Sequence, residues 1–168
     1  MVVRESTDME RVAVVGCALT PDLGRLSIRG LPNRPGVQAI VFEHIAKADV
    51  LVDDIIQNET DDAADVAFTV EGPRLSDVRV AVDAALEAVG SGSISVEVGL
   101  AKVSAVGVGM RSHTGVAALM FRALGDAGIN IANITTSEIK ISCIVPKEHG
   151  PRALQVVHDA FGLAKQPM

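Results

Sequence analysis

Aromatic residues are almost absent from the sequence, which limits both its core and its partners. Among 168 residues there is no Trp, no Tyr and only 4 Phe. Hydrophobic residues still make up 48%, so we expect a core of aliphatic side chains. Rings that could stack on bases are nearly missing, and the formal net charge of -6 disfavours contact with phosphate backbones. Both features argue against nucleic acid as a partner.

Cysteines and long apolar runs are scarce as well. Cys17 and Cys143 each lie inside an apolar run, where a free cysteine is usually a buried small hydrophobe, and they do not make a disulfide framework. No run approaches the roughly 18 apolar residues of a membrane span. Residues 1–10 are charged and lack the apolar stretch of a signal peptide. We therefore expect a soluble, cytoplasmic protein without a membrane partner.

The sequence offers no catalytic or metal-binding constellation. Its histidines share no metal-like spacing with one another or with the cysteines; they are His44, His113, His149 and His158. Five aspartates could hold a hard cation, although a solvated acidic turn explains them better; they are Asp53, Asp54, Asp61, Asp62 and Asp65. The glycines at 107, 109 and 115 have the wrong spacing for a nucleotide-binding fingerprint. We expect no catalytic residue, no metal and no cofactor.

An internal repeat is what the sequence does contain. The segment Leu26–Gly30 has a counterpart at Val103–Gly107, and Pro35–Ala39 has one at Thr114–Ala118. The offset is 77 residues for the first pair and 79 for the second, so the second copy has two extra residues before its helix. A fixed period of this kind indicates one supersecondary unit used twice.

Each copy is predicted to read strand, helix, strand, strand, helix from its periodicity. In the first copy these elements cover residues 25–31, 35–47, 51–57, 66–70 and 76–89, and a further strand covers 94–98. In the second copy they cover residues 102–109, 114–127, 129–135, 139–145 and 148–161. The second copy lacks a last strand, whereas the run 12–18 is predicted as a strand that belongs to neither copy.

We therefore expect the N-terminal strand to complete the second sheet. The predicted fold class is α+β, with two tandem ferredoxin-like βαββαβ domains. The predicted domains cover residues 24–99, and residues 11–19 plus 101–162. Residues 98–101 join the two predicted domains, and this segment is too short to form a flexible linker between them.

Each copy also places a glycine-containing turn directly before a helix. The turns cover residues 31–37 and 110–116. A helix N-terminus presents unpaired N–H groups and a partial positive charge, which suit a carboxylate. Gly36 and Gly115 could instead serve only close packing of strand on helix. His113 lies in the second turn, where a plain surface histidine is the simpler interpretation.

Several segments resemble the C-terminal regulatory region of aspartate kinases. They are Leu31–Gly36 and Ile56–Asn58 in the first copy, and Val103–His113, Ile129–Ile131 and Thr135–Ser142 in the second. The resemblance covers nearly the whole chain after Met9, without a catalytic kinase domain. It implies two ACT domains that bind end-product amino acids of the aspartate pathway, threonine and/or lysine, and so mediate feedback inhibition.

The resemblance further implies an assembly and a binding site. Two regulatory chains would pack side by side as a homodimer, the first ACT domain of one on the second of the other, and would regulate a catalytic aspartate kinase subunit. The effector would bind at this junction. The implied residues are Asn33, Arg34, Pro35, Gly36, Val37, Gln38, Ala39 and Gln57, with Asn130 and Ile131 of the other chain. The pseudo-equivalent site would use Ser112, His113, Thr114, Gly115 and Val116 with Leu51 and Val52.

Two functions of other classes stay open. A small ferredoxin-like enzyme of the acylphosphatase type needs an Arg in a phosphate-cradling loop and a positioned Asn, which Arg34 and Asn33 supply in outline. The duplicated, interface-forming layout argues against this enzyme. A pure oligomerisation module without a ligand is the other alternative.

Overall fold

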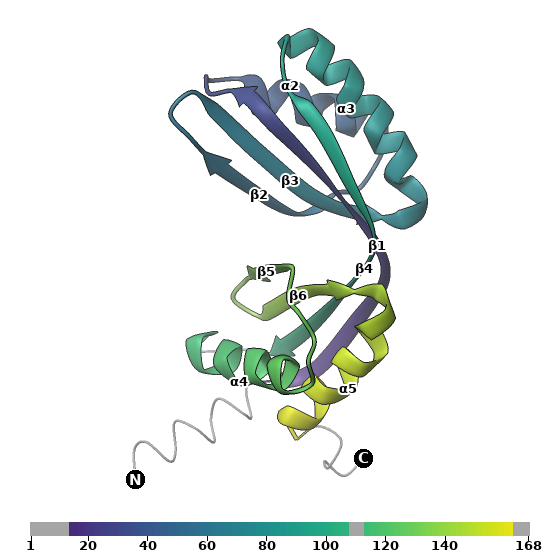
Figure 1. Ribbon diagram of the computed structural model, residues 1–168, viewed down its shortest axis with the longest axis vertical. Helices are drawn as coiled ribbons and strands as arrows, with labels where there is room; N and C mark the ends of the chain where they lie inside the picture. Colours follow the sequence, from purple (N-terminus) through teal and green to yellow (C-terminus); the bar gives the residue numbers. More distant parts are fainter. Residues whose placement is uncertain (1–13, 108–112, 163–168) are drawn as a thin grey trace. The chain divides into compact units, whose positions relative to one another are not determined.

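The computed structural model describes residues 14–107 and 113–162 (Figure 1). The chain forms two compact units, one made from residues up to Pro21 and from Leu100 onward, the other from Asp22–Gly99. Two long strands contribute to both units: β1 (Val14–Pro32) and β4 (Ser93–Gly107). Among the described residues, no helix is long and apolar enough to cross a membrane.

The unit Asp22–Gly99 has the βαββαβ order of a ferredoxin-like fold. Between its parts of β1 and β4 lie α2 (Val37–Lys47), β2 (Asp53–Glu59), β3 (Ala63–Glu71), a short 3-10 turn (Gly72–Arg74) and α3 (Leu75–Val89). The strand order is β2-β3-β1-β4, and β3 pairs antiparallel with both β1 and β2. Both helices cover one face of this sheet (Figure 1).

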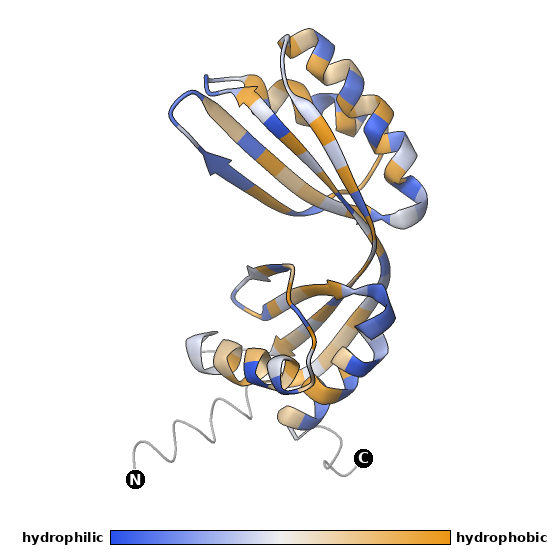
Figure 2. Ribbon diagram, viewed as in Figure 1, coloured by the Kyte–Doolittle hydropathy of each residue, from blue (hydrophilic) through white to orange (hydrophobic). Residues whose placement is uncertain are grey.

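Alternation along the strands separates the two faces of this sheet. Leu26 and Ile28 on β1 and Phe68 on β3 are fully buried against the helices, whereas Ser27 and Arg29, which follow them in alternation, belong to the other face. Figure 2 shows hydrophobic and hydrophilic residues alternating along these strands. The ring of Phe68 packs on that of the partly buried Phe42 with centroids 5.9 Å apart, so this core contains one aromatic pair among aliphatic side chains.

The second unit repeats the plan with a strand taken from the start of the chain. It contains α4 (His113–Asp126), β5 (Asn133–Thr136), β6 (Lys140–Pro146), a 3-10 turn (Lys147–His149) and α5 (Gly150–Ala160). Its strand order is β1-β4-β6-β5. Val14 of β1 is 1% exposed and belongs to the same core as Met120 of α4 and Val157 of α5. The predicted fold class, including the completing N-terminal strand, is therefore confirmed.

Several predicted element bounds were wrong, for identifiable reasons. Residues 12–18 and 25–31 were predicted as separate strands, as were 94–98 and 102–109, but residues 14–18 and 25–31 belong to one continuous strand, as do 94–98 and 102–107. The predicted positions 12, 13, 108 and 109 lie outside the described residues. The helix predicted from Pro35 begins at Val37, because Gly36 has a φ of 92° that a helix does not allow. Strand β5 begins at Asn133 rather than at residue 129.

Candidate functional site

The first predicted binding turn leads into helix α2 through a left-handed glycine. Gly36 is the N-cap residue, with φ 92° and ψ -11°, and no side chain caps the helix. The first N–H groups of a helix have no intrahelical acceptor, so those of Val37, Gln38 and Ala39 can bind an anion. Glycine is required here because an L-residue with a side chain rarely adopts this φ.

Two glutamines link the start of α2 to strand β2. The Nε2 group of Gln38 donates a hydrogen bond to Oε1 of Gln57 at 2.9 Å. Gln57 is exposed and Gln38 is half-buried. Because the Gln57 oxygen already accepts this hydrogen bond, its Nε2 group is the part best placed to meet a ligand oxygen. The structure thus brings together two of the predicted effector-binding residues.

Asn33 ties the same turn to the loop between β2 and β3. Its Nδ2 group donates to the carbonyl oxygen of Thr60 at 3.4 Å, and Thr60 closes its own turn by donating from Oγ1 to the Ala63 carbonyl at 3.0 Å. The Oδ1 atom of Asn33 is left as an acceptor for an ammonium or hydroxyl group. Arg34 and Pro35 beside it are exposed.

Both edge strands expose apolar side chains. Leu51, just before β2, is 88% exposed, and Ile55 on β2 is 54% exposed. In the other unit, Ile134 on β5 is 45% exposed and Ile139 is 53% exposed. Edge strands also carry unpaired backbone N–H and C=O groups. Such edges are suited to pairing with another strand.

The remaining predicted residues lie in the unit that contains α4 and α5. Asn130 is exposed and Ile131 is half-buried, both in the segment between α4 and β5. Thr114 is exposed and Val116 is buried in the core. Ser112 lies outside the described residues, and His113 begins α4. In the other unit, Leu51 and Val52 lie before β2, which begins at Asp53 instead of the predicted residue 51.

Other chemistry-bearing groups do not gather into a site. In residues 14–107 and 113–162, no group of three His, Cys, Asp or Glu side chains could hold a metal ion. The solvated turn predicted for the five aspartates is wrong for Asp54, which is only 9% exposed on β2. Burial raises the pKa of the Cys17 thiol to about 11 and that of Cys143 to about 12, so both thiols are protonated near neutral pH.

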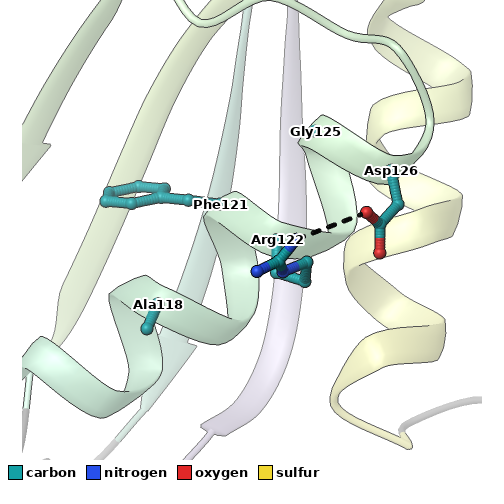
Figure 3. A pocket seen from close by; sticks show the side chains of 5 residues that line it. All are labelled: Ala118, Phe121, Arg122, Gly125 and Asp126. Carbon is teal, nitrogen blue, oxygen red and sulfur yellow. Dashed lines mark ion pairs between the residues drawn. The ribbon is translucent and has the colours of Figure 1, made fainter.

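A hollow of about 500 Å³ lies on the surface of α4 (Figure 3). It is lined by Ala118, Phe121, Arg122, Gly125 and Asp126. The Arg122 and Asp126 side chains form an ion pair with 3.8 Å between Nη1 and Oδ1, and both are largely exposed. None of the described residues of the predicted binding turns lines this hollow.

Comparisons with known proteins agree on one family. Residues 103–161 match the ACT domain family. The aspartate kinase of Pseudomonas putida is 38% identical over 95% of this chain, which covers 39% of that kinase. Aspartokinase from Thermus thermophilus is 39% identical over 91% of this chain and 38% of its own length. The chain thus spans about two-fifths of the length of these relatives.

Some solved structures match over nearly their full length. The ligand-free regulatory subunit of aspartate kinase from Thermus thermophilus is 39% identical with a TM-score of 0.81, and the match covers 89% of this chain and 99% of that subunit. A structure of aspartokinase alpha and beta subunits gives 40% identity and a TM-score of 0.79, with 89% and 99% covered. The chain therefore belongs to the family of aspartate kinase regulatory subunits, built from ACT domains.

Proposed function

We propose that this chain binds an end-product amino acid, threonine and/or lysine, and thereby mediates feedback inhibition of aspartate kinase. The observation that carries the proposal is the Gln38–Gln57 amide pair beside the uncapped start of α2. Backbone N–H groups at this start suit an α-carboxylate. The Gln57 amide and the Asn33 carbonyl oxygen offer a donor and an acceptor for the rest of a small zwitterion.

The proposed site is completed by a second copy of the chain. Each unit would be one ACT domain, and the effector would lie between the turn of one chain and Asn130 and Ile131 of the other. The exposed Leu51 and Ile55 at one sheet edge, and Ile134 at the other, support pairing of edges between chains. The pseudo-equivalent site would use residues 112–116 with Leu51 and Val52.

Binding across such an interface explains regulation by linkage. An effector that binds only the associated state stabilises it by about 2.7 kcal/mol at a hundredfold excess over its dissociation constant. Inhibition follows if the catalytic part is less active in that state. The catalytic partner would be an aspartate kinase subunit that phosphorylates aspartate with ATP; one matched structure contains aspartokinase alpha and beta subunits. A cytoplasmic location stays a prediction from the sequence.

The test is isothermal titration of the chain with threonine and with lysine. We expect binding of at least one of them, and a loss of about tenfold or more in affinity for Gln57→Ala and for Asn130→Ala, the upper range for removing one hydrogen-bonding side chain. The matched control is Gln155→Ala, because Gln155 is exposed on α5 and contacts Asp159 in its own helix.

Each outcome separates the alternatives. Unchanged affinity in both variants would contradict the assignment of Gln57 and Asn130 to the effector site. An absence of heat with both amino acids, together with a stable dimer in sedimentation experiments, would favour a ligand-free oligomerisation module instead. Sedimentation of a monomer that stays a monomer with excess effector would contradict the proposed junction between two chains.

A further inference from the structure

Between Asp53 and Ile56, shortly before Gln57, strand β2 contains one residue more than its partner strand β3. Asp53 lies opposite Thr69 of β3, but Ile56 lies opposite Ala67. Two residues of β2, Asp54 and Ile55, therefore face a single residue of β3, which is the arrangement of a β-bulge. Asp54 has a φ of 53°, in the left-handed region that non-glycine residues rarely occupy. Asp and Asn tolerate it better than other side chains.

The side chain of Asp54 helps to hold this backbone. Oγ1 of Thr69 donates a hydrogen bond to Oδ2 of Asp54 at 2.6 Å and lies 3.2 Å from the Asp53 carbonyl oxygen. Oδ1 of Asp53 accepts a hydrogen bond from the Asp54 backbone N–H at 2.8 Å. Thr69 is 1% exposed and Asp54 is 9% exposed. A short hydrogen bond to a buried carboxylate is among the stronger kinds.

The bulge decides on which face Gln57 lies. Side chains directly opposite one another on paired strands share a face, and alternate residues share a face along a strand. If residues 53–57 paired one to one with β3, Gln57 would lie opposite Asp65, on the same face as Asp53 and away from α2. With the extra residue, Gln57 lies opposite Val66, a core residue that is 2% exposed under the helices. On this face Gln57 meets Gln38 of α2.

The residues after the bulge show the same change of face. Ile56 lies opposite Ala67 and Asn58 opposite Asp65. These four residues line one hollow of about 170 Å³ together with Ser27 and Arg29 of β1, which alternate with the core residues of that strand. The inserted residue therefore decides which face of the sheet Ile56 and Asn58 share, and Gln57 lies on the opposite face.

We propose that Asp54 is a positioning residue for the effector site: its left-handed backbone and its hydrogen bond from Thr69 maintain the bulge that places Gln57 beside Gln38. This inference rests on the proposed function for its meaning in effector binding. The placement of Gln57 itself can be measured without any ligand.

The first experiment measures that placement in the full-length chain. Nuclear Overhauser contacts between the side-chain amides of Gln38 and Gln57 should be present in the wild type and lost in Asp54→Ala and Thr69→Val. Asp54→Asn should keep them, because asparagine tolerates a positive φ and retains an acceptor oxygen. Asp62→Ala is the control, since it removes the same charge from an exposed position in the adjoining turn.

The second experiment titrates the same variants with threonine and with lysine. Asp54→Ala and Thr69→Val should each weaken the affinity about tenfold, matching the expected loss of the Gln57 contact. The double variant should be no weaker than the stronger single one, because both substitutions remove one interaction. Asp54→Asn and Asp62→Ala should bind with an affinity within about twofold of the wild type.

The results distinguish this inference from the proposed function. Retained Gln38–Gln57 contacts in Asp54→Ala and Thr69→Val would overturn the positioning role, whatever binds. If the wild type binds neither amino acid, the proposed function is contradicted. If Asp54→Ala and Thr69→Val nevertheless lose the Gln38–Gln57 contacts, the positioning role is still supported. If Asp54→Ala does not fold by circular dichroism, Asp54→Gly replaces it, because glycine accepts the φ and removes only the carboxylate.

Discussion

Replacing Gly36 by alanine tests whether the turn before α2 depends on backbone conformation rather than on space. A Cβ placed at Gly36 would meet no heavy atom within 4 Å beyond its chain neighbours. No steric clash therefore contributes to the effect of the substitution. The cost comes from the φ of 92°, which an L-residue adopts at a penalty of about 1–2 kcal/mol.

The expected net effect is smaller than this penalty. Alanine also restricts the unfolded chain, which stabilises the fold by about 0.4–1 kcal/mol. We therefore expect Gly36→Ala to lower the free energy of unfolding by about 1 kcal/mol. Gly36→Asn should cost less, because asparagine tolerates the left-handed region. Effector affinity should fall too, since the N–H groups of the first turn would shift.

Gly125 provides a matched comparison within the same chain. It lies in α4, its φ is not positive, and an added Cβ would likewise meet nothing within 4 Å. Alanine is preferred to glycine inside a helix by about 0.5–1 kcal/mol, so Gly125→Ala should stabilise the protein. Urea unfolding followed by circular dichroism measures both variants. A Gly36→Ala protein as stable as the wild type, or shifted in the same direction as Gly125→Ala, would refute the reasoning.

Two further predictions concern the cores. Phe68→Ala should lower the free energy of unfolding by about 3–5 kcal/mol, because the side chain is 0% exposed and packs on Phe42; a loss below 1 kcal/mol in urea unfolding would contradict this. Cys17, with its pKa raised by burial from 9.0 to about 11, should react with iodoacetamide at pH 8 about two orders of magnitude more slowly than free cysteine. The folded state then holds a proton that the unfolded state loses above pH 9, so stability should fall between pH 9 and 11. Cys17→Ala should reduce that fall and leave the part due to Cys143, whose pKa is also raised by burial.

The repeat in the sequence was enough to predict the fold class, because each copy carries its own hydrophobic periodicity. Continuous strands were harder to predict, since Pro21 and Gly24 have the composition of a turn. In the structure both lie within β1. A Cβ at Gly24 would lie 2.9 Å from the Leu75 side chain and 3.3 Å from the Glu97 carbonyl oxygen, a close approach that no local pattern reveals.

The candidate residues came from the sequence, whereas the geometry around them came from the structure. Gly36 and Gln57 were selected through family resemblance, and the structure adds how they are held. The hydrogen bond between Gln38 and Gln57 depends on a register change in β2, which strict alternation of side chains cannot anticipate. Asp54 looked like one member of a solvated acidic cluster, and only its buried contact with Thr69 shows otherwise.

The sharing of β1 and β4 between the two units has a consequence for biosynthesis. Residues 22–99 form a unit that is contiguous in the chain, so it can close as soon as those residues have left the ribosome. The segment around Val14 belongs to a core whose other members come after residue 100. This earlier strand must wait for the residues after 100 before its apolar side is covered, and chaperones can protect it during that interval.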